Sequence, residues 1–519
     1  MTRNIIKPYL SLLFLSVGCL AIFLSLHEPL RDFGNYYYGS RLLLDGKFNH
    51  QMYTSIHYFN QQINSYGEIN FFENYIPVTP FSAVFYVPFC FFKSLHAKLL
   101  FNILSLLLLC CSIYRLQNFH LLQSKIIYVL PVIFFYPLYN NILQGQAYVL
   151  LCALLIEVYM ASEKKQIFLA SFLMALIISL KIFPVILLLY FLLKRNFKTV
   201  GLTVLFLLLF FFLSYFILPP DTISYYFSHV LPRLFNNDVV GTYYHGNQSV
   251  YTSLLQLFSY DELSNPHPLV NYSFLIVIFE SLFVAFLLTF IFLVRNKNTF
   301  LFFSFVLFSS LLLGRYNTGY SLILLLPFCV SFILEDIKHY YLYLLFICVF
   351  VTNYVPVGSL ASFPFLIKFS RLWGLILILI LAALLYRLKM DYKLFAILFI
   401  LVTIFKFISF PIQPINYFTL QNTKGILYDI TVGSDSIILK STLGEKDYLE
   451  TFAFKAKAEL KENLIIEDNV VYYKDKVICN TKDNKLNPFV YNDTSVVFMS
   501  DLNQAVGFYK LRYISLDSQ

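Results

Sequence analysis

The stretch that decides the fold is residues 8–46, which read PYLSLLFLSVGCLAIFLSLHEPLRDFGNYYYGSRLLLDG. Its first half, residues 8–26, is apolar and uncharged, and it follows Arg3 and Lys7. A signal peptide has an apolar core of about 7–15 residues and a small-residue cleavage site. This run is longer and lacks that site, so we expect a first transmembrane helix with its N-terminus in the cytoplasm.

The composition extends this interpretation to the whole chain. Of its 519 residues, 59% are hydrophobic and 13% are charged, whereas a soluble globular chain carries about 25% charged residues. So little charge cannot coat a water-soluble surface of this size. This excludes a soluble enzyme, a disordered chain and a nucleic-acid binder. We predict an all-α polytopic membrane protein with the bilayer as its main partner.

Apolar runs between residues 78 and 412 predict roughly 11–14 transmembrane helices in all. Basic loops that begin at Lys194, Arg295 and Arg387 belong in the cytoplasm, because cytoplasmic loops of membrane proteins carry an excess of Lys and Arg. Alternation of the spans then places the long polar loops 27–77 and 219–271 on the outer side. We expect a multi-pass protein of the cell (inner or plasma) membrane, with a transmembrane domain over residues 1–414.

The run 166–193 is too long for one ordinary span and leaves two alternatives. In the first it is a single long helix. In the second it is a hairpin that turns at Lys181-Ile182-Phe183-Pro184, and the run 78–94 does not cross the membrane. Lys164 and Lys165 favour the hairpin, because they place a basic loop before it.

The tail, residues 419–519, changes to strand-like segments separated by turn clusters. Examples are Ser436–Leu439, Asn469–Tyr473, Ser495–Phe498 and Phe508–Tyr513. This pattern predicts a small all-β domain on the extracytoplasmic side. It contains no catalytic constellation, and we interpret it as a stabilising or docking module.

Asp32 follows the first apolar run directly and is expected at the outer membrane interface. The residues after it predict an amphipathic helix along the membrane surface, with Asp32 or Gly34 at its start and Gly46 just beyond its end. A carboxylate at this depth can accept a proton from a hydroxyl group, which contributes about 10²–10⁴ in rate. The structural alternative is that Asp32 caps the helix or pairs with Arg31 or Arg41.

Five segments, taken in order, carry a resemblance to a known family. They are Asp32-Phe33 with Tyr36-Tyr37 and Leu43-Leu44-Asp45-Gly46, then Gln144-Gly145-Gln146, then Ala170–Leu180 with Lys181-Ile182-Phe183-Pro184, then Gly246-Asn247-Gln248-Ser249, and last Gly314–Tyr320 followed by Pro327. Together they resemble glycosyltransferase family 87, whose members are integral-membrane enzymes of the GT-C type. The resemblance covers residues 8–335, without the tail. Tyr148 stands where the family typically has an asparagine.

The resemblance implies a GT-C-like fold and transfer of a sugar, mannose by default, from a polyprenyl-phosphate donor. A glycan or glycolipid would accept it on the extracytoplasmic side. Asp32, by position, would be the catalytic base of a single inverting displacement. No obligatory metal is implied, and we expect no cofactor. The outer side offers no clear cluster of carboxylates in the sequence.

Candidate substrate-binding residues follow from this assignment. For the donor phosphate, the cationic candidates are Lys181, Arg315 and Arg41. Their alternatives are a snorkelling lysine, a turn residue and a partner of Asp45, respectively. For the sugar and acceptor, the candidates with amide, hydroxyl or imidazole groups are Tyr36, Tyr37, Gln144, Gln146, His245, Asn247 and Gln248.

Other classes of membrane protein remain open at this point. An O-antigen polymerase or ligase also has many helices and a large outer loop, but it does not need a carboxylate after the first helix. A transporter or flippase of lipid-linked sugars often shows internal repeats, and none is visible here. A structural scaffold agrees less well with Gln144, Gln146 and Lys181 in or beside apolar runs.

Overall fold

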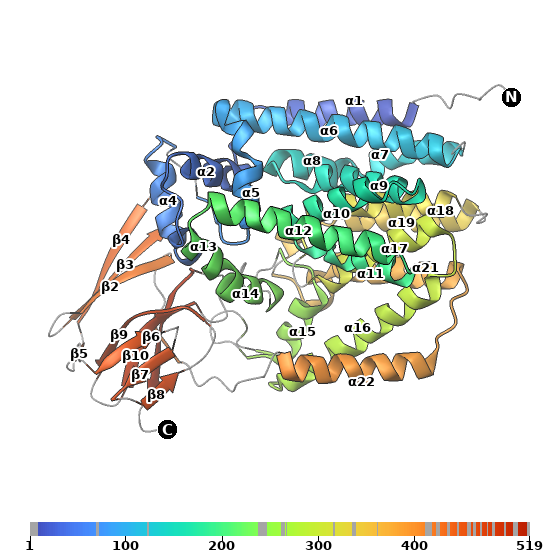
Figure 1. The fold of residues 1–519 in the computed structure, drawn as a ribbon. Coiled ribbons are helices and arrows are strands. Elements are labelled where there is room, and N and C mark those ends of the chain that lie inside the picture. Colours follow the sequence, from blue (N-terminus) through green and yellow to red (C-terminus); the bar gives the residue numbers. More distant parts are fainter. Residues whose placement is uncertain are drawn as a thin grey trace.

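The computed structural model is helical up to Ser409 and forms strands from Phe418 onward (Figure 1). It describes residues 9–68, 72–121, 124–236, 246–260, 265, 267–314, 317–334, 339–360, 362–409, 418–421, 426–432, 436–443, 446–453, 458–459, 463–467, 470–474, 476–479, 483–491, 495–501 and 507–515. The prediction of a mostly helical protein with a small C-terminal β region is confirmed.

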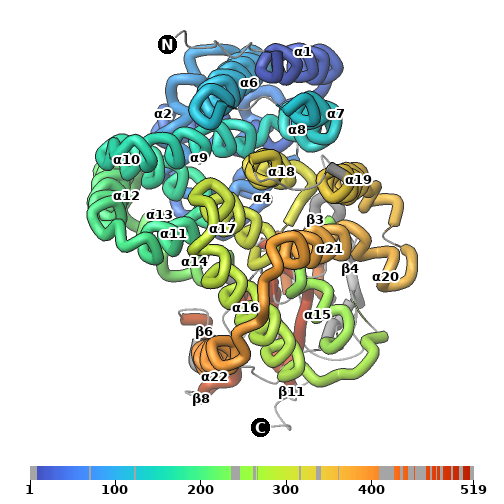
Figure 2. Tube along the Cα trace, turned by 90° about the vertical axis from the view of Figure 1, so that its right-hand side faces the viewer, coloured from blue at the N-terminus to red at the C-terminus, as the bar shows by residue number. Residues whose placement is uncertain are grey.

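Most helices lie side by side with similar axis directions, and Figure 2 shows several of them nearly end-on. In chain order the α-helices are α1 (Tyr9–Leu24), α2 (Phe33–Leu44), α3 (Gln51–Thr54), α4 (Ile56–Asn64), α5 (Pro80–Phe85), α6 (Ser94–Phe119), α7 (Leu130–Ile133), α8 (Phe135–Gln144), α9 (Tyr148–Glu163), α10 (Ile167–Leu180), α11 (Leu188–Leu193), α12 (Phe197–Ile217), α13 (Pro220–Tyr225), α14 (Leu231–Asn236), α15 (Val250–Phe258), α16 (Phe274–Val294), α17 (Thr299–Leu313), α18 (Leu326–Ile333), α19 (His339–Tyr354), α20 (Phe365–Lys368), α21 (Ser370–Leu385) and α22 (Tyr392–Ser409). Short helical turns join them: η1 (Val87–Phe91), η2 (Lys125–Val129), η3 (Phe183–Leu187), η4 (Tyr226–Val230), η5 (Gly319–Leu325) and η6 (Val357–Leu360).

Among the described residues, three helices are long and apolar enough to cross a membrane, namely α6, α12 and α16. The bent pair Lys125–Ile133 and Phe135–Gln144 makes a fourth if it is one span. Eight further apolar helices of 10–17 residues are shorter than the roughly 20 residues of a straight span. The predicted number of spans therefore stays a prediction.

The burial of the helices separates a protein core from an apolar outer surface. Helix α9 is buried along nearly its whole length, and so is α17, as expected of helices that are apolar on every side and packed among others. Helix α12 is equally apolar, but only 11% of the residues in its 18-residue apolar stretch are buried. Exposed Phe212 and Phe216 are typical of a surface that faces lipid rather than water.

The chain breaks at Lys181, which has an extended backbone between α10 and η3. The single-helix alternative for residues 166–193 is therefore wrong, and the turn of the hairpin alternative is where the sequence predicts it. The apolar segment Pro80–Phe91 is about half as long as a spanning helix needs to be.

Helix α2 ends as predicted, because Gly46 adopts a left-handed φ of +67° directly after the C-cap Asp45. Its environment differs from the prediction of a helix along the membrane surface, since every residue from Phe33 to Ser40 is buried by protein. Gly39 explains the close packing: a Cβ atom there would lie 2.2 Å from the Tyr75 ring. The helix is clamped inside the molecule, and its side chains can therefore reach interior groups.

The C-terminal β region consists of antiparallel pairs. Among the described residues the strand orders are β1-β11-β10-β9-β5, β2-β3-β4 and β6-β7-β8. The strands are β1 (Phe418–Gln421), β2 (Ile426–Val432), β3 (Ser436–Leu443), β4 (Lys446–Ala453), β5 (Ala458–Glu459), β6 (Leu464–Glu467), β7 (Val470–Tyr473), β8 (Lys476–Cys479), β9 (Lys485–Tyr491), β10 (Ser495–Ser500) and β11 (Lys510–Ser515). Strands β3, β7, β10 and β11 each cover most or all of one of the four segments expected from the sequence.

The β region is docked on the two polar loops, beside α4 and α13 in Figure 1. The guanidinium of Arg233 in α14 lies 3.0 Å from the Asp501 carboxylate, and both side chains are buried. The Tyr509 hydroxyl donates to the backbone oxygen of Thr54. Both loops and the tail thus meet at one end of the helices, as expected if all three lie on the same side of a membrane.

Candidate functional site

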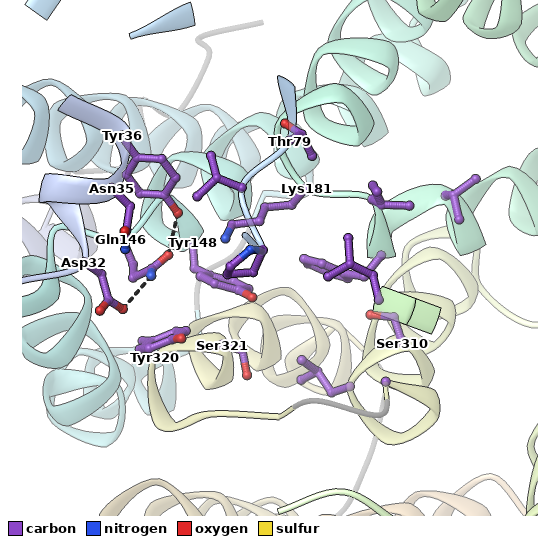
Figure 3. Close-up of a pocket in the computed structure, with 18 of the residues that line it drawn as sticks. Asp32, Asn35, Tyr36, Thr79, Gln146, Tyr148, Lys181, Ser310, Tyr320 and Ser321 are labelled. Carbon is purple, nitrogen blue, oxygen red and sulfur yellow. Dashed lines mark hydrogen bonds between the residues drawn. The ribbon is translucent and has the colours of Figure 1, made fainter. Parts of the chain in front are cut away.

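A cavity of about 470 Å³ lies among α2, the segment before α5, the start of α9, the break at Lys181 and the end of α17 (Figure 3). Its polar lining includes Asp32, Asn35, Tyr36, Glu73, Gln146 and Lys181. Its apolar lining comes from η3 and its flanks, α14, and the end of α17, with Ile182, Phe183, Val185, Ile186, Leu231, Leu234, Leu311 and Leu313. The volume and the mixed lining suit a small-molecule site.

Asp32 occupies the N-cap position of α2, but its side chain makes no capping hydrogen bond. Instead its Oδ2 accepts a hydrogen bond of 2.6 Å from Nε2 of Gln146. Arg31 bonds to Glu28, and Arg41 pairs with Asp45. Both structural alternatives for Asp32 are therefore wrong, and its carboxylate is available to the cavity.

Burial raises the pKa of the Asp32 carboxyl above its ordinary value. The hydrogen bond from Gln146 and the positive charge of Lys181 oppose this rise, because both favour the ionised form. A carboxylate with a raised pKa is a stronger base than an exposed one.

Gln146 is aimed at Asp32 by the turn that ends α8. Gly145 takes a left-handed φ of +67°, and a Cβ atom on it would lie 2.5 Å from Cβ of Phe33. Only glycine fits this turn, which brings Gln146 beside the start of α2. The Tyr36 hydroxyl donates to Oε1 of Gln146 at 2.8 Å, and this bond fixes the amide with its NH₂ group toward Asp32.

The Lys181 ammonium lies beside the rings of Tyr36 and Tyr148. Its Nζ is 5.5 Å from the centre of the Tyr36 ring and 5.8 Å from that of Tyr148, within the range of cation–π attraction. The Thr79 hydroxyl donates to the Ser179 carbonyl at 2.6 Å and so ties the segment before α5 to the last turn of α10. No carboxylate of the described residues lies within 4.0 Å of Nζ, so the ammonium can receive an anion from a ligand.

Two further features of this cavity were not found from the sequence. Glu73 is a second buried carboxylate in the lining, and its Oε2 accepts a 2.6 Å hydrogen bond from Nδ2 of Asn35. Lys98 lies behind the site and donates to the carbonyl oxygens of Pro29 and Leu143, both at 2.7 Å. Lys98 thereby holds the loop before Asp32 against the end of α8. Tertiary packing brings the carboxylates of Asp32 and Glu73 into one cavity, but the described residues contain no group of three or more His, Cys, Asp or Glu side chains placed to hold a metal ion.

Residues 79–314 match the model of glycosyltransferase family 87. The matched segment is therefore similar to this family, as the resemblance in the sequence predicts. The match begins at Thr79 and ends at Gly314, both of which line the cavity, while Asp32 and Glu73 precede it. Neither the curated proteins nor the solved structures yield a match. Together with the apolar helices, this match supports a membrane glycosyltransferase.

Five of the described candidate binding residues lie outside the cavity lining, and three of them are Tyr37, Arg41 and Gln144. The Tyr37 hydroxyl donates to the carbonyl oxygen of Phe92 at 2.9 Å. Arg41 lies 3.3 Å from Asp45, as the alternative interpretation of that residue expects. Gln144 is the last residue of α8 and does not contribute to the lining.

Asn247 and Gln248 are buried beside the cavity rather than in its lining. Oδ1 of the Asn247 side chain accepts from the backbone N–H of Asn317, and its Nδ2 donates to the Thr252 hydroxyl. The Gln248 amide donates to the carbonyl oxygen of Lys368 at 3.0 Å. These bonds tie the second polar loop to later segments. His245 and Arg315 lie outside the described residues.

Proposed function

We propose that this glycosyltransferase moves a hexose, mannose by default for the family, from a polyprenyl phosphate to a hydroxyl group of a glycan or glycolipid. The reaction takes place in the cavity at Asp32, on the extracytoplasmic side. The observation that carries the proposal is a partly buried carboxylate in a 470 Å³ cavity, oriented by Gln146 and with no cation of the described residues within 4.0 Å.

In the proposed reaction, the acceptor oxygen attacks the anomeric carbon of the donor sugar. The bond from this carbon to the phosphate oxygen breaks, and its electron pair leaves with the polyprenyl phosphate. Asp32 takes the proton of the acceptor hydroxyl as the new glycosidic bond forms. A single displacement of this kind inverts the configuration of the anomeric carbon.

Lys181 is the proposed partner of the donor phosphate. Negative charge grows on the leaving phosphate in the transition state, and a fixed cation beside it lowers the barrier. The apolar lining from η3, α14 and the end of α17 supports a lipid-linked donor, because an isoprenoid chain needs apolar contacts next to its phosphate.

The test is Asp32→Asn in purified protein reconstituted into vesicles with labelled polyprenyl-phosphate sugars. Asparagine keeps an oxygen that can accept from Gln146 but cannot take a proton, so we expect the transfer rate to fall by about 10²–10⁴. Transfer at the parent rate would contradict the assignment of the base.

The same vesicles separate the competing classes. A ligase of the O-antigen type transfers a glycan from a polyprenyl diphosphate, and a flippase moves label across the bilayer without forming a new glycoside. Label in a new glycoside, formed only from the monophosphate donor, supports the proposed function against both.

A further inference from the structure

Glu73 and Asn35 form a pair in the cavity to which the proposed reaction gives no role. The Glu73 carboxylate and the Asn35 amide are both about 8% exposed, and both line the cavity with Asp32. The Asn60 side chain bonds to the backbone N–H and C=O of Glu73, each at 2.8 Å. This clamp fixes Glu73 although it lies in a loop.

Both members of the pair have an oxygen without a protein donor. Oδ1 of Asn35 is buried, and no described residue donates to it. Glu73 accepts from Asn35 through Oε2 only, and no cation of the described residues lies within 4.0 Å of its carboxylate. Buried acceptors are normally satisfied by a donor. The unsatisfied Oδ1 of Asn35, next to a carboxylate that lines the same cavity, therefore points to a ligand that donates hydrogen bonds.

Burial and the nearby charge of Asp32 raise the pKa of Glu73 well above its ordinary value. Two carboxylates in one cavity without a paired cation resist ionising together. Hydroxyl groups of a ligand relieve this strain, because they donate to an ionised carboxylate and can also accept from a protonated one.

The geometry of in-line attack indicates which substrate binds beside Asn35 and Glu73. Asn35 follows Asp32 by three residues on α2, so their side chains are neighbours one helical turn apart. Tyr36, the next residue, points to Gln146 and Lys181 instead, and Figure 3 shows Lys181 well to the right of Asn35 and Asp32. Attack in line requires the entering and leaving oxygens on opposite sides of the anomeric carbon. With the phosphate at Lys181, the acceptor lies on the side of Asn35.

We propose that Glu73 and Asn35 form an acceptor subsite that binds a second hydroxyl group next to the one that Asp32 activates. The inference rests on the proposed function and narrows it. The acceptor group is then a sugar with neighbouring hydroxyl groups, and an alcohol with a single isolated hydroxyl is a poor acceptor.

The experiment uses the full-length protein in vesicles, a labelled polyprenyl-phosphate sugar, and pairs of octyl glycosides that differ by one hydroxyl group. We expect the parent protein to prefer one octyl glycoside over its monodeoxy analogue by about 10- to 100-fold in kcat/KM, the effect of one hydrogen bond to a charged group. Glu73→Gln should reduce this preference at least several-fold while the KM of the donor stays within about two-fold.

Glu68→Gln is the matched control, because Glu68 is in the same loop, accepts hydrogen bonds from Tyr38 and Ser94, and does not line the cavity. It should keep the parent preference. Equal losses for both acceptors of a pair in Glu73→Gln, a raised donor KM, or equal use of octanol and the glycosides by the parent protein would each overturn the subsite. Absence of transfer from every labelled donor would instead overturn the proposed function.

Discussion

The two polar loops of this protein are both long and polar in sequence, but they contribute different side chains to the cavity. The first, residues 27–77, supplies five polar side chains to the cavity: Asp32, Asn35, Tyr36, Glu73 and Asn74. The described residues of the second, 219–271, add only the apolar Leu231 and Leu234 to the lining, while Asn247 and Gln248 bond to other protein groups. The hydrogen-bond partners of a loop amide therefore show whether it stabilises the protein or is available to a ligand.

The largest expected change in kinetics comes from Lys181, the cation beside the first loop. Lys181→Met removes the ammonium from the faces of Tyr36 and Tyr148 but keeps an unbranched apolar chain. We expect the KM of the polyprenyl-phosphate donor to rise about 10- to 100-fold, because one charge-assisted contact to phosphate is lost. Steady-state kinetics with varied donor measures this, and an unchanged KM would support a snorkelling lysine.

The second loop should respond in stability rather than in catalysis. Asn247→Ala leaves the backbone N–H of Asn317 without its acceptor in a buried place. We expect the free energy of unfolding to fall by about 1–3 kcal/mol, with the donor KM of the folded protein within about two-fold of the parent value. Thermal melting in detergent and steady-state kinetics give both numbers. A large rise in the donor KM without a loss of stability would contradict the structural role of Asn247 and place the second loop in donor binding.

The smallest expected effect is a shift in pH dependence. The Gln146 amide stabilises the ionised form of Asp32, so Gln146→Met should raise the pKa of that carboxyl further. Because the base must be ionised, the acid limb of kcat/KM should move to higher pH, by up to about one unit. Tyr36→Phe, which keeps the Gln146 amide, serves as the control and should shift the limb less. Movement of the limb to lower pH in Gln146→Met would contradict the role of this bond.

Much of the site was visible in the sequence because its parts sit at breaks in apolar runs. Asp32 follows the first run, Gln146 follows Gly145 before α9, and Lys181 interrupts the run 166–193. A polar residue at such a point costs free energy unless it has a partner or a function. All three line one cavity.

Glu73 and Asn35 escaped prediction because their position depends on tertiary contacts. Nothing local marks Glu73: the Asn60 clamp and the burial of α2 against Tyr75 place it. The sequence pattern also does not separate Tyr36 from Tyr37, which differ by one residue. About 100° of helix rotation sends one to the cavity and the other to the carbonyl of Phe92.

The β region contacts both polar loops and so connects segments that are distant along the chain. Arg233, held by Asp501, lies between Leu231 and Leu234 of the cavity wall, and Gly507 lies against Ile56 and Ile76 near the wall segment that contains Glu73. A movement of the β region is therefore transmitted to the cavity through two separate contacts. A partner that binds the β region therefore contacts a part of the molecule that is joined to two sides of the cavity.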